Sequence, residues 1–239
     1  MKVAAYQAPL LTVGSMGALP LIRERVKWCE TQGIEILCCP EAILGGLADY
    51  AESTYEFAMD SSALVPLLEG ISSQIVTTII GFTEVSRRGL LYNSAAVFHR
   101  GSMLGIYRKL HPAINRSVYE PGTDIPVFTV GDLTFGIVIC NDSNFPEVVA
   151  RIAAKGATAL FVPTNNALPS KREHWNLVGE ARKVDATNAV QNSLWIIRAD
   201  VAGRTDQLVS RGSSGIVDPV GRLVESAPEL EESLIRAEI

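Results

Sequence analysis

Histidine, cysteine and aromatic residues are scarce in this chain. Its 239 residues include 3 His and 4 Cys, and aromatic residues make up 7% of the total. So few imidazoles and thiols leave few ligands for a metal site and few bases for catalysis that depends on histidine. Any catalysis is therefore expected to rest on other side chains.

The sequence also lacks a secretory leader, a disulfide framework and a long apolar run. Gln7 and Pro9 interrupt the short apolar stretch at the N-terminus, which argues against a signal peptide. Cys29, Cys38 and Cys39 are clustered without paired spacing, as in reduced proteins. No run approaches the roughly 18 apolar residues of a membrane helix. These absences predict a cytoplasmic protein with no membrane partner.

An excess of acidic residues excludes a further class of partner. The chain has 26 Asp and Glu against 21 Lys and Arg, which gives a net charge of −5. Nucleic acids attract clustered Lys and Arg, so no nucleic acid is an expected partner. With 47% hydrophobic residues, a chain of this length buries a core without disulfides or metals. No linker or repeat divides it, so we expect one domain over residues 1–239.

Hydrophobic periodicity predicts strands and helices in a mixed order. A helix over residues 20–32, ended by Gly33, lies between strands over 3–7 and 34–39. The other expected strands are 75–85, 90–98, 103–108, 127–130, 133–140, 157–162, 193–199, 215–218, 223–226 and 234–238, with helices over 145–155 and 172–191. This order favours an α/β fold in which mixed sheets pack in layers with helices outside.

Three expected strands are followed or ended by chemically useful side chains, namely Glu41, Lys109 and Cys140. Strand ends on a rigid scaffold are where α/β proteins place reacting groups. The amide dipoles at a helix N-terminus favour the thiolate form of a nearby thiol, and the thiolate is the nucleophile. A carboxylate can take its proton, and an ammonium can stabilise an oxyanion. The alternatives are a buried structural thiol, a helix-start carboxylate and a solvated lysine.

Longer motifs around these residues favour the catalytic interpretation. Residues 136–147 read GIVICNDSNFPE and resemble the nucleophile motif of the nitrilase superfamily, the carbon–nitrogen hydrolases. Residues 40–46, PEAILGG, resemble the general-base motif of that family, and residues 107–112, YRKLHP, resemble its lysine motif. Residues 4–7, AAYQ, and 212–221, GSSGIVDPVG, extend the resemblance over nearly the whole chain.

The resemblance implies a four-layer α-β-β-α sandwich and a hydrolase without metal or organic cofactor. In this family Cys140 would be the nucleophile, Glu41 the general base and Lys109 the group that stabilises the tetrahedral intermediate. The backbone N–H of Asn141 would be a second oxyanion donor. Family members often pair, so a homodimer or higher homo-oligomer is expected.

The sequence departs from the family pattern at two places. Asn141 stands where an aromatic residue usually follows the nucleophile. Many members carry a second Glu after the lysine, but Asn115 and Arg116 occupy that region here. The nearest glutamate is Glu120, which is our candidate for a second carboxylate, and Arg116 is an alternative that would face the substrate.

The predicted substrate is a small linear amide, cleaved at a non-peptide C–N bond. Asn165 and Asn166 follow an expected strand, so they either line the substrate pocket or form an Asx-type turn. A nitrile or an N-carbamoyl compound is an alternative substrate, and the latter calls for a cation such as Arg116 or Arg172. An inactive binding or regulatory protein that retains the fold is the alternative from another class.

Overall fold

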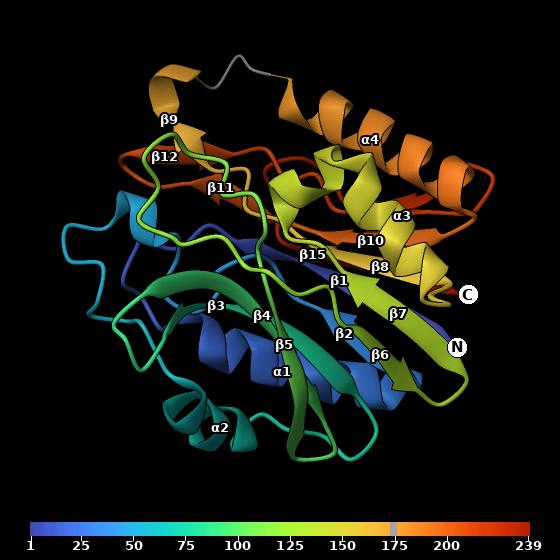
Figure 1. The fold of residues 1–239 in the computed structure, drawn as a ribbon, viewed down its shortest axis with the longest axis horizontal. Coiled ribbons are helices and arrows are strands. Elements are labelled where there is room, and N and C mark those ends of the chain that lie inside the picture. The colour runs from blue at the N-terminus through green and yellow to red at the C-terminus, as the bar shows by residue number, and fades with distance from the viewer. Residues whose placement is uncertain (173–175) are drawn as a thin grey trace.

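The computed structural model describes residues 1–172 and 176–239, which form four layers (Figure 1). Helices α1 (Ala18–Gln32) and α2 (Ser61–Glu69) cover the outer face of one sheet. Helices α3 (Pro146–Ala154) and α4 (Leu177–Asn192) cover the outer face of the other. This arrangement is the expected α-β-β-α sandwich.

The first sheet combines parallel strands at its centre with an antiparallel meander at one edge. Its strands run β5-β4-β3-β2-β1-β11-β12-β9, and β15 also pairs with β1. Strands β1, β2 and β3 are parallel to one another, whereas β3, β4 and β5 form the meander. The bounds are β1 Lys2–Pro9, β2 Ile36–Cys38, β3 Thr77–Val85, β4 Leu91–His99, β5 Ser102–Arg108, β9 Leu168–Pro169, β11 Val201–Arg204, β12 Leu208–Ser210 and β15 Ser233–Glu238.

The second sheet runs β14-β13-β10-β8-β7-β6. Strand β8 is parallel to both β7 and β10, and the outer pairings are antiparallel. The bounds are β6 Val127–Val130, β7 Leu133–Ile137, β8 Ala159–Pro163, β10 Trp195–Ala199, β13 Gly215–Val217 and β14 Leu223–Ser226. Because β7, β8 and β10 share one direction, the loops after them open at the same edge.

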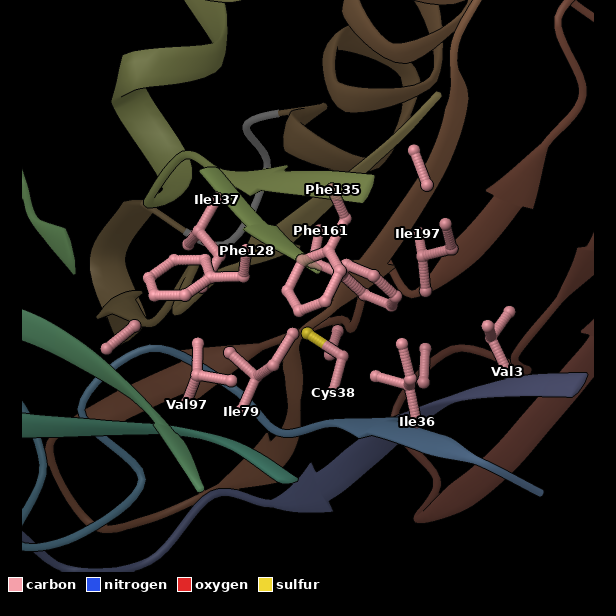
Figure 2. Packing of buried hydrophobic residues seen from close by; sticks show 14 of the residues in the cluster. Val3, Ile36, Cys38, Ile79, Val97, Phe128, Phe135, Ile137, Phe161 and Ile197 are labelled. Atoms are coloured by element: carbon pink, nitrogen blue, oxygen red, sulfur yellow. The ribbon is translucent and has the colours of Figure 1, made fainter. Parts of the chain in front are cut away.

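The main hydrophobic core fills the space between the two sheets. Figure 2 shows Phe128, Phe135 and Phe161 of the second sheet above Ile79 and Val97 of the first. Phe135 and Phe161 meet edge to face with their centroids 5.1 Å apart. Burial of such side chains gives about 25 cal/mol for each Å² of apolar surface, so this interface fixes the relative position of the two sheets.

The expected strand–helix–strand opening and the three-stranded meander are confirmed. Helix α1 buries Ile22, Val26 and Cys29 on one face, and Gly33 ends it with φ 64°. The sequence reading missed α2, which contains Pro66, and the short strands β9, β11 and β12. Such short segments show too few residues for a period to emerge.

Two element boundaries differ from the expectation by three residues or more. The strand expected to end at Cys140 ends at Ile137, and a 3₁₀ helix, η2 (Cys140–Asn144), begins at the cysteine. The helix expected from residue 172 begins at Leu177 in the described part of the chain, and residues 173–175 lie outside it. Among the described residues, no helix has the length and apolar character needed to cross a membrane.

Candidate active site

Glu41 lies in the loop after β2 and is almost completely buried. Its Oε1 accepts hydrogen bonds from Lys109 Nζ at 2.6 Å and from Asn93 Nδ2 at 2.7 Å. Its Oε2 accepts from the backbone N–H of Asn165 at 2.9 Å. All three partners donate to it, so the site is organised around an ionised carboxylate, which only accepts.

Gly81 on β3 allows the Glu41 loop to lie against the sheet. A Cβ at this position would stand 2.4 Å from both the carbonyl oxygen of Pro40 and the backbone nitrogen of Ala42. No real side chain tolerates such a distance, so any larger residue must displace the loop. The position of the Glu41 carboxylate therefore depends on the absence of a side chain at Gly81.

Lys109 lies just after β5 and is 4% exposed. Its backbone N–H donates to the carbonyl oxygen of Asn93 at 2.8 Å, and its carbonyl oxygen accepts from the backbone N–H of Gly122 at 2.8 Å. Burial by itself would lower the pKa of the Lys109 ammonium, but the charge of Glu41 and the hydrogen bond to it act in the opposite direction, and the pKa lies above its usual value. Lys109 is therefore a fixed cation beside Glu41.

Cys140 is the first residue of η2 and adopts a left-handed backbone with φ 47°. This conformation is uncommon for a residue other than glycine, and such strain recurs at functional sites. The hydroxyl of Ser143 donates to the carbonyl of Cys140 at 2.7 Å and helps to hold the turn. The thiol lies 3.6 Å from Oδ1 of Asn166, to which it donates.

Arg198 of β10 supports the same turn from behind. Its Nε donates to Oδ2 of the fully buried Asp185 at 2.8 Å, and a second nitrogen donates to Ser143 Oγ at 3.2 Å. A third donates to Thr164 Oγ1 at 2.8 Å. This buried ion pair links α4, β10, the end of β8 and η2, so it positions the segment that carries Cys140.

The environment of Cys140 favours the neutral thiol in the free protein. Burial and the charge of Glu41 raise its pKa to about 12, although Lys109 and Arg198 act in the opposite direction. Desolvation and the neighbouring carboxylate therefore outweigh the amide dipoles, which favour the thiolate. A thiol in this state has to lose its proton before it can act as a nucleophile.

A cavity of about 730 Å³ opens over these groups. Glu41, Lys109 and Cys140 all line it, so the structure brings the three predicted residues together. Asn141, Asn165 and Asn166 line it as well. Apolar side chains form much of the remaining wall, among them Leu47, Ile114, Leu168, Leu177 and Val184.

The two candidates for the second charged position lie elsewhere. Glu120 and Arg116 are both exposed, and neither lines the cavity. The Arg116 backbone has φ 59°, a left-handed turn that leads its loop along the surface. Asn115 lines the cavity from the same loop. The side chain of Arg172, the other predicted cation, lies outside the described part of the structure.

Several site residues were not anticipated from the sequence. Asn93 on β4 and Arg198 on β10 are polar residues inside buried strands, which is the signal that marks them, whereas Asp142 lies in a polar run that gives no such signal. Asp142 accepts from the backbone N–H groups of His111 and Ile139, and so connects the lysine loop to the cysteine turn. Within the described residues, no group of three or more His, Cys, Asp or Glu side chains is arranged to hold a metal ion.

Comparisons with known proteins agree with this geometry. The model of the carbon-nitrogen hydrolase family matches residues 2–239. A probable nitrilase from Schizosaccharomyces pombe is 32% identical over 164 residues, which cover 67% of this chain and 58% of that protein. The deaminated glutathione amidase from Escherichia coli O157:H7 is 27% identical over 248 residues, which cover 100% of this chain and 90% of that protein.

A solved structure shares the fold over the whole chain. An amidase from Nesterenkonia sp. superposes with a TM-score of 0.86 at 22% identity, covering 100% of this chain and 90% of that one. The four-layer sandwich expected from the sequence is thereby confirmed.

Proposed function

The chain belongs to the carbon–nitrogen hydrolase family, and from that premise we propose that it hydrolyses a small linear amide through a thioester at Cys140. The observation that carries the proposal is the buried pair of Glu41 and Lys109, joined at 2.6 Å in the same cavity as Cys140. An inactive protein would have no need to keep a buried ion pair, which is costly to desolvate, beside an accessible thiol.

The reaction proceeds in two halves. Glu41 takes the proton of Cys140 as the sulfur attacks the amide carbon, and the resulting oxyanion is stabilised by the Lys109 ammonium and the backbone N–H of Asn141. The protonated carboxyl of Glu41 then gives its proton to the leaving ammonia or amine, and the thioester remains. In the second half Glu41 activates a water that cleaves the thioester and releases the acid and the free thiol.

The shape of the cavity limits the size of the substrate. A volume of about 730 Å³ lies within the range of pockets for small molecules. Apolar side chains such as Leu47, Ile114 and Leu168 suit the aliphatic part of a substrate, and the amide lies toward the polar groups around Cys140. Nitriles pass through the same covalent cysteine intermediate, so they remain the alternative substrate.

Ammonia release across a panel of linear amides, nitriles and carbamoyl acids tests the proposal. We expect turnover of amides, and intact mass spectrometry should trap an acyl adduct that disappears in the Cys140→Ala variant. Glu41→Gln should lower turnover by at least about 10²-fold, the contribution of a general base. Cys29→Ala, which alters a buried thiol on α1, is the matched control and should retain activity. Turnover by Cys140→Ala, or no hydrolysis of any amide in the panel, contradicts the proposal.

A further inference from the structure

The side chain of Asn166 lies between the nucleophile and a second buried carboxylate. Asn166 follows β8, and its Oδ1 accepts the thiol of Cys140 at 3.6 Å. On the other side its Nδ2 donates to Asp200 Oδ2 and to Ser213 Oγ, both at 3.1 Å. Asp200 follows β10 and is fully buried, as is Ser213.

Asp200 determines which way the Asn166 amide faces. Its Oδ1 accepts from the backbone N–H groups of Asn166 at 3.0 Å and Val201 at 2.8 Å. Its Oδ2 accepts from Ser213 N at 2.9 Å and Ser213 Oγ at 2.6 Å, in addition to Asn166 Nδ2. An ionised carboxylate only accepts hydrogen bonds, so the NH₂ end of Asn166 must face Asp200 and its carbonyl end must face Cys140.

This direction has a consequence for the sulfur. A carbonyl oxygen can accept a hydrogen bond from a neutral thiol. It cannot stabilise a thiolate, because a thiolate accepts hydrogen bonds and needs donors around it. The contact thus stabilises the protonated form and fixes the direction of the S–H bond. Burial and the charges of Glu41 and Asp200 also disfavour the thiolate, and the pKa of Cys140 is correspondingly high.

We propose that Asn166 holds Cys140 as a neutral, oriented thiol until a substrate arrives, and that Asp200 is the positioning residue that aims the Asn166 carbonyl. The inference rests on the proposed function, because it describes the resting state of that nucleophile. When an amide enters, the S–H contact with Asn166 breaks, the proton passes to the Glu41 carboxylate, and the sulfur lone pair forms the bond to the amide carbon. The free enzyme is thereby poorly reactive toward electrophiles that are not substrates.

The first test measures the reactivity of Cys140 toward methyl methanethiosulfonate, a small thiol reagent that is not an amide. In Asn166→Leu the rate at pH 7.5 should rise about fivefold, the factor that corresponds to one lost hydrogen bond, and the pH profile should move to lower pH. Turnover of amides should fall in the same variant, because the thiol is no longer oriented. Asn192→Leu makes the same change at the end of α4, outside the cavity, and should alter neither rate.

These two opposite changes distinguish the proposal from a structural role. A variant that is merely destabilised loses turnover, but its pH profile of thiol modification does not shift. An unchanged profile therefore overturns the role of Asn166. The reagent reports on the thiol whether or not amides are substrates, so failure of the proposed function remains distinguishable. If Asn166→Leu does not fold, the same measurements are made on Asn166→Ala, and the infrared S–H stretching band of Cys140 is recorded in the wild type. Subtracting the spectrum of Cys140→Ala isolates this band. A band at the frequency of a thiol without a hydrogen bond overturns the proposal.

A double-mutant cycle tests the part assigned to Asp200. Removing its charge in Asp200→Asn should increase the reactivity of Cys140, both directly and by releasing the Asn166 amide to turn. In the Asn166→Leu background only the direct effect of charge remains, so the increase should be smaller. Equal increases in both backgrounds show that Asp200 acts by charge alone, and they overturn its positioning role.

Discussion

The phenolic hydroxyl of Tyr107 donates a hydrogen bond to the fully buried carboxylate of Asp142, with 2.7 Å between Oη and Oδ2. Tyr107 lies on the strand that leads to Lys109, and Asp142 lies in the turn that begins with Cys140. This contact thus links the segments that carry Lys109 and Cys140, two proposed catalytic residues that are remote in the sequence.

Replacing Asp142 with asparagine should uncouple these two groups. Its carboxylate accepts from Tyr107 and from the backbone N–H groups of His111 and Ile139, whereas an amide must turn one NH₂ toward a donor. We expect the free energy of unfolding to fall by about 1–3 kcal/mol, the cost of an unsatisfied buried group.

Turnover of amides by Asp142→Asn should fall well below the level that this loss of stability explains. Urea denaturation and steady-state kinetics measure the two effects on the same preparation. Asp132→Asn changes an exposed turn residue and is the matched control. Full activity in Asp142→Asn would show that Asp142 does not set the geometry of the site.

Lys109→Met removes the cation that Glu41 contacts. The carboxylate then stays buried with Asn93 and Asn165 as its remaining donors, so stability should fall by about 3–5 kcal/mol, as for other broken buried pairs. Lys109 also lowers the pKa of Cys140, so the pH profile of thiol modification should move to higher pH.

The control for this variant is Lys183→Met, which removes an exposed partner of Glu180 at 3.3 Å. Exposed pairs of this kind contribute about 0.5 kcal/mol or less, so neither stability nor thiol modification should change appreciably. A profile for Lys109→Met that moves to lower pH, or does not move, contradicts the assigned electrostatics.

Gly81→Ala tests whether the Glu41 loop depends on close contact with β3. The added Cβ would meet Pro40 O and Ala42 N at 2.4 Å, so the loop must shift and carry the carboxylate with it. Effects of misplaced catalytic groups reach about 10²-fold in rate for a shift of about 1 Å.

We therefore expect kcat/KM of Gly81→Ala to fall by about that factor, with a measurable loss of thermal stability. Gly70 lies at the end of α2, where an added Cβ has no contact shorter than 3.5 Å. Gly70→Ala should therefore behave as the wild type in the activity assay. An unaffected kcat/KM in Gly81→Ala would mean that Glu41 does not need this placement.

Much of the site could be predicted because its three groups are tied to local sequence patterns. Glu41, Lys109 and Cys140 each come shortly after a strand, and strand ends in α/β folds converge at one edge. The flanking motifs then favoured the catalytic interpretation over the structural alternatives. The apolar runs predicted layers of mixed sheet with helices outside, whereas the four-layer arrangement was implied by the resemblance to the family.

The supporting contacts could not be predicted, because they join residues that are distant in the sequence. Nothing near Asp142 indicates that it accepts from Tyr107, and nothing near Arg198 indicates Asp185 on α4 as its partner. The causes that raise the pKa of Cys140 could not be found in the sequence for a similar reason. A helix terminus is visible in the sequence, but burial and the charge of Glu41 exist only in the folded chain.

Buried thiols should make the stability of the protein fall at alkaline pH. Burial raises the pKa of Cys29 to about 12 and raises that of Cys38 well above its usual value. In the unfolded chain these thiols ionise at about pH 8.5. Above that pH the folded state therefore holds more protons than the unfolded state. The range ends at about pH 10, where tyrosines of the unfolded chain also begin to ionise. The contribution of each thiol is therefore complete below about pH 8.5 and decreases as the pH rises.

The expected slope is about 1 kcal/mol per pH unit for each such thiol, measured by urea denaturation between pH 7.5 and 10. Cys29→Ala should reduce the slope by that amount, because one of the groups is gone. Val26→Ala removes a buried side chain from the same face of α1 without a titrating group, so it should lower stability equally at every pH. A free energy of unfolding that stays constant over this range, or an unchanged slope in Cys29→Ala, would show that these thiols ionise as readily in the folded core as in the unfolded chain.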